Sequence, residues 1–164
     1  MSTREPALTF REMLAYTDFL AYRWLDYFKK NEAALVVEVG GRTPTLRDLV
    51  GHIFQVELFF ANLLIDTAAM PTARPPQVES SSLETLERMH REAHQKLCQY
   101  VASVDEETLR QSRKLGPTTA SNRKILAQAT LHSVHHWAQV AMEVRQAGLP
   151  TLPPQDIIIS PALE

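Results

Sequence analysis

Apolar residues recur at helical spacing along most of this chain. In the stretch 82–104 they fall three, four or seven positions apart, which places one set on a single helix face: Leu83, Leu86, Ala93, Leu97, Val101 and Val104. The stretch 44–67 has a similar stripe, in which His52 occupies a core-facing position. Only 36–39 and 157–159 resemble short strands. The pattern predicts an all-α protein.

Prolines and capping residues mark where the helices begin and end. The ten prolines leave four long proline-free windows, and proline is excluded from helix interiors because it lacks an amide hydrogen. Each window opens with residues that cap a helix: Thr9 with Glu12, Thr45 with Asp48, Ser81 with Glu84, and then Thr119 or Ser121. The expected helices lie near 9–33, 44–67, 82–104 and 120–147.

Four helices of similar length predict a four-helix bundle in a single domain, residues 1–164. The long connection is the crossover between the second and third helices, 68–81. We expect a further helical turn within 105–114 and a proline-rich tail, 149–164, that wraps over the bundle.

Composition narrows the class of protein. Apolar residues make up 45% of the 164 residues and charged residues 22%, as in ordinary globular domains. The net charge of −2 leaves no basic excess for nucleic acid. The single cysteine, Cys98, is expected to be a small buried residue in a reducing compartment. No apolar leader or long purely apolar run is present, so we expect a cytoplasmic protein that does not enter a membrane.

The last predicted helix carries a polar stripe. No charged residue occurs from Ile125 to Met142, which predicts a buried helix, yet six polar residues share one side: Gln128, His132, His135, His136, Gln139 and Glu143. Buried polar groups without partners cost about 1–3 kcal/mol each. The stripe therefore predicts a cavity that holds water, a metal or a ligand.

Three histidines of this pattern are candidate metal ligands. His132 and His136 are four residues apart, which stacks two imidazoles on one helix face. His52 is a third candidate from the second helix. Three imidazoles from two packed helices leave open positions on a metal, as reactive sites do.

Further polar residues flank these candidates. His135, Gln139 and Glu143 are candidate catalytic or pocket residues, and Asp48 and Gln55 are placed to orient the His52 imidazole.

A second histidine pair, His90 and His94, has the same spacing. His90 flanks the apolar stripe of its helix and His94 lies among charged residues, so we interpret the pair as part of a partly solvated face. Trp137 points away from the polar stripe and is expected to pack in the core.

Two segments resemble a known family. Residues 47–57, with His52-Ile53 and Glu57, resemble the "H-I-x-x-x-E" motif of DinB-like proteins, and residues 132–148 resemble their "H-x-x-x-H-x-x-Q … R-x-x-G" motif. The resemblance covers nearly the whole chain. This sequence has Trp137-Ala138 where the commonest pattern has Arg-Gly.

The resemblance implies a four-helix bundle with one long crossover and a divalent transition metal, zinc or else nickel, on His52, His132 and His136. Members include S-transferases that use bacillithiol, mycothiol or glutathione, and a thiol-dependent maleylpyruvate isomerase. Members are often homodimers.

The first hypothesis is a metal-dependent thiol S-transferase, or a related hydrolase or isomerase. A free thiol has a pKa near 8.5, and coordination to a metal deprotonates it, so that it can attack an electrophile at neutral pH. Its partners would be a small-molecule thiol and an electrophile. Cys98 is not expected to be the nucleophile, because no histidine pair is placed to activate it.

Two other classes stay open. One is a non-catalytic, stress-related bundle protein that binds a metal or ligand, which a fourth protein ligand closing the site would favour. The other is an interaction protein without a metal, whose polar stripe is paired within the bundle or across a dimer.

Overall fold

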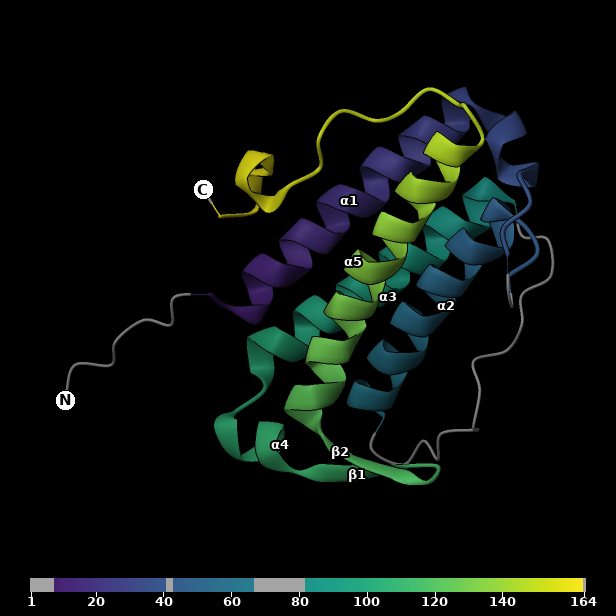
Figure 1. The fold of residues 1–164 in the computed structure, drawn as a ribbon. Coiled ribbons are helices and arrows are strands. Elements are labelled where there is room, and N and C mark those ends of the chain that lie inside the picture. Colours follow the sequence, from purple (N-terminus) through teal and green to yellow (C-terminus); the bar gives the residue numbers. More distant parts are fainter. Residues whose placement is uncertain (1–7, 41–42, 67–81, 164) are drawn as a thin grey trace.

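The computed structural model describes residues 8–40, 43–66 and 82–163 and shows a mostly helical chain (Figure 1). Its helices are α1 (Phe10–Lys30), α2 (Leu46–Ile65), α3 (Leu83–Ser103), α4 (Glu106–Arg110) and α5 (Asn122–Gln146). The four long helices end within a few residues of the predicted positions. The predicted long crossover, 68–81, lies outside the described residues.

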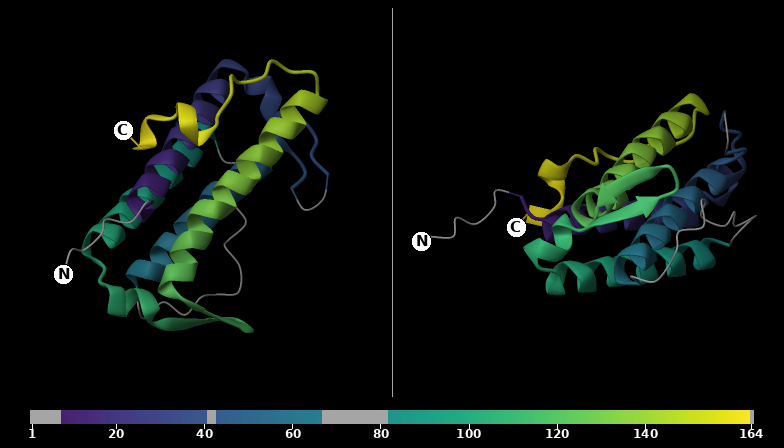
Figure 2. Two further views of the ribbon diagram at one scale, coloured as in Figure 1. Left: turned by 60° about the vertical axis from the view of Figure 1, so that its left-hand side comes forward. Right: turned by 90° about the horizontal axis from the view of Figure 1, so that it is seen from below.

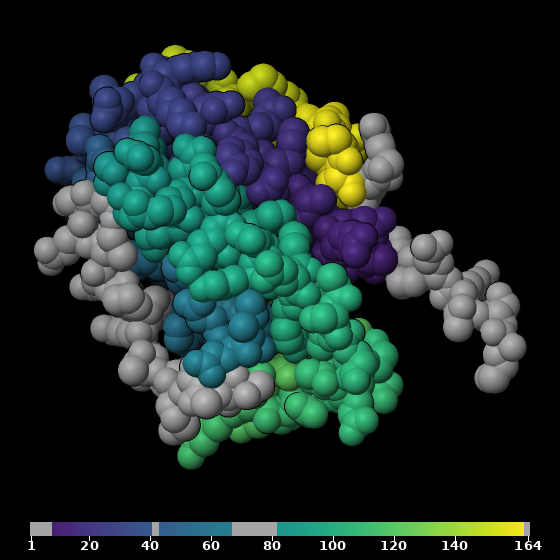
Figure 3. All heavy atoms as spheres, turned by 180° about the vertical axis from the view of Figure 1, so that it is seen from behind, coloured from purple at the N-terminus to yellow at the C-terminus, as the bar shows by residue number. Residues whose placement is uncertain are grey.

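The four long helices lie alongside one another. α2 packs against α3 and α5, and α1 packs against the same two helices. In the space-filling view from behind, α3 and α1 lie side by side across the face (Figure 3). The histidines of α2 and α5 therefore belong to two helices that are in direct contact.

Capping residues begin the helices as the sequence predicts, with one exception. Thr9 and Thr45 each form a capping box with the acidic residue three positions later. Of the two candidates before α5, Ser121 is the cap, and it accepts a hydrogen bond from the amide of Lys124. The third predicted box is wrong, because α3 is capped by Ser82 rather than by Ser81 with Glu84.

The structure contains a short hairpin that the sequence does not predict. Strands β1 (Ser112–Leu115) and β2 (Thr118–Ser121) pair antiparallel, and Gly116 takes the left-handed conformation, with φ of +58°, in the turn between them. The hairpin lies across one end of the long helices (Figure 2). Both strands are only four residues long and largely exposed, so they have no apolar alternation to predict them. The predicted extra turn within 105–114 is confirmed, and it is α4.

One buried side chain holds the hairpin to the helices. Asn122 is fully buried, its carboxamide oxygen accepts from Arg113 Nε at 2.7 Å, and its Nδ2 donates to the Thr108 carbonyl at 2.8 Å. Arg113 also donates to the Leu63 carbonyl at 2.7 Å, near the end of α2. The hairpin is thereby tied to both α2 and α5.

The larger part of the core surrounds an aromatic stack between α1 and α5. The rings of Trp24 and Trp137 lie 6.1 Å apart and within 8° of parallel. Both side chains are almost completely buried, which confirms the expectation that Trp137 packs in the core. Phe28 packs against Trp24, and Phe54 packs against Trp137.

α5 is less buried than the sequence predicts. Leu131 and Met142 expose 57% and 42% of their surface, and His135 is also exposed. The expectation of a wholly buried helix is therefore wrong. An absence of charged residues does not require burial, since one side of α5 faces solvent with apolar and uncharged polar side chains.

α2 is long and apolar enough to cross a membrane by length and composition. However, 56% of its most apolar stretch is buried inside the structure, against α3 and α5. α2 therefore has the character of a core helix.

The segment after α5 runs back along α1 (Figure 1). It contains two short 3₁₀ helices, Ile157–Ile159 and Pro161–Leu163, so the β-like run at 157–159 is not a strand. The hydroxyl of Tyr16 on α1 donates to the Gln155 carbonyl at 2.8 Å. This bond attaches the segment to α1.

Replacing Asn122 with alanine should lower the free energy of unfolding by about 1–3 kcal/mol, because Arg113 Nε and the Thr108 carbonyl lose their buried partner. Denaturant titration followed by circular dichroism measures the change. Gln128→Ala, at an exposed position of the same helix, is the control and should change stability little. Equal losses in the two variants would contradict the assigned role of Asn122.

Candidate metal site

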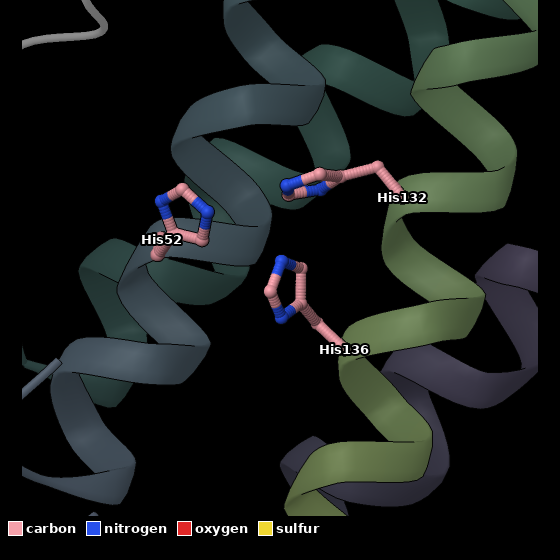
Figure 4. A group of neighbouring side chains, drawn as sticks. All are labelled: His52, His132 and His136. Atoms are coloured by element: carbon pink, nitrogen blue, oxygen red, sulfur yellow. The ribbon is translucent and has the colours of Figure 1, made fainter. Parts of the chain in front are cut away.

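Three histidines from two helices converge on one point. His52 extends from the second turn of α2, and His132 and His136 extend from the middle of α5 (Figure 4). Their ring centroids are 5.0 Å apart for His52 and His132, 5.1 Å for His52 and His136, and 4.4 Å for His132 and His136. One nitrogen from each ring lies within 4.8 Å of the other two.

These separations are close to what a metal requires. Nitrogens bound to one zinc ion lie roughly 3–3.5 Å apart, given bond lengths of about 2.0–2.1 Å. Small rotations of the side chains can close that difference. Among the described residues, no further histidine, cysteine or carboxylate joins the group, so the ligand set is open.

The three imidazoles are in the protonation state that binds metals. Burial lowers the pKa of all three, and neighbouring imidazoles lower the pKa of His52 and His132 further. For His132 the pKa falls to about 3. Neutral imidazole is the ligating form.

Hydrogen bonding supports the same interpretation. His136 Nδ1 lies 3.0 Å from Gln139 Oε1, so an Nδ1–H can donate to Gln139 and leave Nε2 available as a ligand. His132 Nδ1 is buried and has no hydrogen-bond partner. A buried polar atom without a partner is destabilising. Three neutral imidazoles that face one point, one of them with such an atom, fit a transition metal ion.

The other predicted site residues lie in different surroundings, and only some of them are near the three histidines. Gln139 contacts His136, as described. His135 is exposed, with its ring 5.2 Å from that of His136, and Glu143 is half-buried further along the same side of α5. Asp48 Oδ2 accepts hydrogen bonds from the amide and the hydroxyl of Thr45. This carboxylate is therefore part of the capping box at the start of α2. Gln55 is half-buried in the turn after His52.

A buried ionic network lies beside the histidines. Glu57 on α2 is 4% exposed, and its Oε1 accepts from Ser133 on α5 at 2.5 Å. Its Oε2 lies 2.9 Å from Nδ1 of His90 on α3, whose Nε2 lies 3.0 Å from Asp18 on α1. All four long helices contribute a side chain to this network.

This network corrects the prediction for His90. The side chain is buried, only 1% exposed, and not on a partly solvated face. Burial by itself lowers its pKa, but the charge of Glu57 and the hydrogen bonds to Asp18 and Glu57 outweigh that effect and raise it to about 9. One signal in the sequence indicates such a partner, because Glu57 is the only charged residue between Leu49 and Ile65.

His94 and Cys98 also differ from expectation. His94 is half-buried, with Nδ1 3.8 Å from Asp18, and its Nε2 lies 3.3 Å from the Cys98 sulfur. A histidine is therefore near the thiol, contrary to the prediction. Burial nevertheless raises the pKa of Cys98, so its resting form is the neutral thiol.

Comparison with known proteins places the chain in a family. Residues 1–157 match the model of the DinB family. The chain belongs to the DinB family. Its fold is similar to the crystal structure of a DinB-like protein, YjoA, from Bacillus subtilis, with a TM-score of 0.63 and 20% sequence identity over 90% of this chain and 96% of that one. No curated protein sequence matches the chain.

The raised pKa of His90 predicts a pH dependence of stability. His90 binds its proton more tightly in the folded chain than in the unfolded one, whose pKa is about 6.5. Its contribution is therefore complete below about pH 6.5 and is lost as the pH rises through about 9. Chemical denaturation across this pH range should show the fall in wild type and a smaller fall in His90→Gln.

His135→Ala is the control for this measurement, because His135 is exposed and outside the network. It should keep the wild-type pH dependence. An identical pH dependence in wild type and His90→Gln would show that His90 is not the titrating group.

Proposed function

We propose that this DinB-family protein binds a divalent transition metal ion through His52, His132 and His136 and uses the open side of the site for thiol-dependent transfer chemistry. The observation that supports this most is the open set of three neutral imidazoles, with nitrogens within 4.8 Å of one another. Imidazole suits zinc, nickel, copper and iron. We propose zinc, with nickel as the alternative.

The bound ion would lower the pKa of a coordinated thiol, so that the thiol is ionised at neutral pH. In the transfer, the thiol sulfur forms a bond to an electrophilic carbon, the bond from that carbon to its leaving group breaks, and the leaving group takes the electron pair. The thiol proton goes to a base, for which we propose His135 or Glu143. Gln139 holds the His136 ring in place through its hydrogen bond.

The first test is metal content. Untagged protein purified without chelators should contain about one transition metal ion per chain by elemental analysis, since the ligands come from one chain. His136→Ala should lose the metal. His135→Ala, which removes the neighbouring exposed imidazole, should retain it. Metal-free wild type whose melting temperature zinc does not raise would contradict the proposed metal site.

The second test concerns the thiol. Metal-loaded protein should accelerate the reaction of at least one of glutathione, cysteine, bacillithiol or mycothiol with chlorodinitrobenzene, and His136→Ala should not. Addition of that thiol to cobalt-substituted protein should change the visible absorption of the cobalt. A protein that binds the metal but shows neither effect with any of the thiols would be a non-catalytic metal-binding protein.

A further inference from the structure

One buried hydrogen bond joins the two helices that carry the three histidines. Ser133 Oγ on α5 donates to Glu57 Oε1 on α2 at 2.5 Å, and the two residues are 0% and 4% exposed. A bond from a hydroxyl to a carboxylate is charge-assisted and about twice as strong as a bond between neutral groups. The three histidines, in contrast, are only half-buried. The bond therefore lies toward the interior of the bundle, and the histidines lie nearer to solvent.

The bond and the histidines occupy different sides of the same two helices. Ser133 directly follows His132, and Glu57 follows His52 by five residues. In an α-helix these steps turn the side chains by about 100° and about 140° from the histidines. Rotation of either helix about its axis would therefore move the hydrogen bond and the histidines together.

Glu57 is itself held in place by a third helix. Its second carboxylate oxygen, Oε2, lies 2.9 Å from Nδ1 of His90 on α3. Nε2 of His90 in turn lies 3.0 Å from Asp18 on α1. Because both of its oxygens are engaged, the carboxylate cannot follow Ser133 if α5 turns. Rotation of α5 against α2 therefore breaks a buried hydrogen bond, which is costly.

A small rotation of one helix is enough to disrupt a metal site. At about 5–6 Å from the helix axis, a rotation of about 20° moves a side-chain atom by roughly 2 Å. That displacement is as large as a zinc–nitrogen bond, about 2.0–2.1 Å. Ligands have to be held within about 0.5 Å of their productive positions. The orientation of α2 against α5 therefore decides whether the three imidazoles reach one ion.

We propose that Glu57 and Ser133 are positioning residues of the metal site, which hold α2 and α5 in the orientation that brings His52 to His132 and His136. Glu57 is not one of the candidate ligands and acts through its hydrogen bonds. This inference rests on the proposed function, since it requires that the histidines bind a metal.

The test is the zinc affinity of variants, measured by competition with a chromophoric chelator under conditions where circular dichroism shows each variant to be folded. Ser133→Ala and Glu57→Ala should each lower the affinity about tenfold or more, as loss of a residue that supports metal ligands does. The visible absorption of bound cobalt should also change, because the angles between its ligands change. Ser133→Ala is the milder variant, since Glu57 keeps its bond to His90.

Two control variants separate positioning from charge and from stability. Glu57→Gln removes the charge but keeps an oxygen that accepts from Ser133 and gains an amide that donates to neutral His90, so it should retain most of the zinc affinity. Asn122→Ala is on α5 and should be destabilised, but Asn122 holds the hairpin and not α2 against α5. It should bind zinc as wild type does.

The outcomes distinguish this inference from the metal site itself. Wild-type affinity in both Ser133→Ala and Glu57→Ala would overturn the positioning role and leave the metal site in place. Equal losses in Glu57→Gln and Glu57→Ala would overturn it as well, because the charge of Glu57 would then set the affinity. An equal loss in Asn122→Ala would trace the effect to general stability and overturn it too. A wild-type protein that binds no metal would overturn both proposals.

Discussion

Three of the four long helices meet at one buried carboxylate, that of Glu57 on α2. A carboxylate removed from water is stable only when it is paired and hydrogen-bonded, and Glu57 obtains both from other helices, through Ser133 on α5 and His90 on α3. Asp18 extends the network to α1. The requirement to satisfy these groups constrains how the helices slide and rotate against one another, which apolar packing alone does weakly.

The candidate metal site depends on that alignment. Ser133 follows His132 directly, and Glu57 is one and a half turns after His52 on α2. The bond between Ser133 and Glu57 therefore joins the same two helices that carry the three histidines. α5 therefore has its metal-site histidines toward α2 and Trp137 toward α1 and the core.

Local signals in the sequence predict the helices well. A proline or a capping residue acts on the backbone within a few residues of itself, so these residues locate the ends of the helices. The periodicity of α5 also predicts that His132 and His136 share a face, and the structure brings His52 to them. That these residues bind a metal stays a prediction.

Features that depend on distant residues could not be predicted in this way. The sequence places His90 on a partly solvated face because its partners Glu57 and Asp18 are 33 and 72 positions away and leave no local signal. The hairpin was missed because its short, exposed strands are held by Asn122 and Arg113 rather than by an apolar face. Asp48, proposed to orient His52, completes the capping box with Thr45 at the start of α2, a local role that its spacing from Thr45 also predicts.

The capping box of α2 bears on how an ion would enter and leave. α2 begins at Leu46, six residues before His52, whereas His132 and His136 lie far from both ends of α5. Helix ends open locally at far lower free energy than helix interiors do. Fraying of the first two turns of α2 would withdraw one ligand while the other two stay fixed on α5. The exchange rate of a bound ion would then follow the opening rate of this helix end, which hydrogen exchange of the α2 amides reports, rather than the rate of global unfolding.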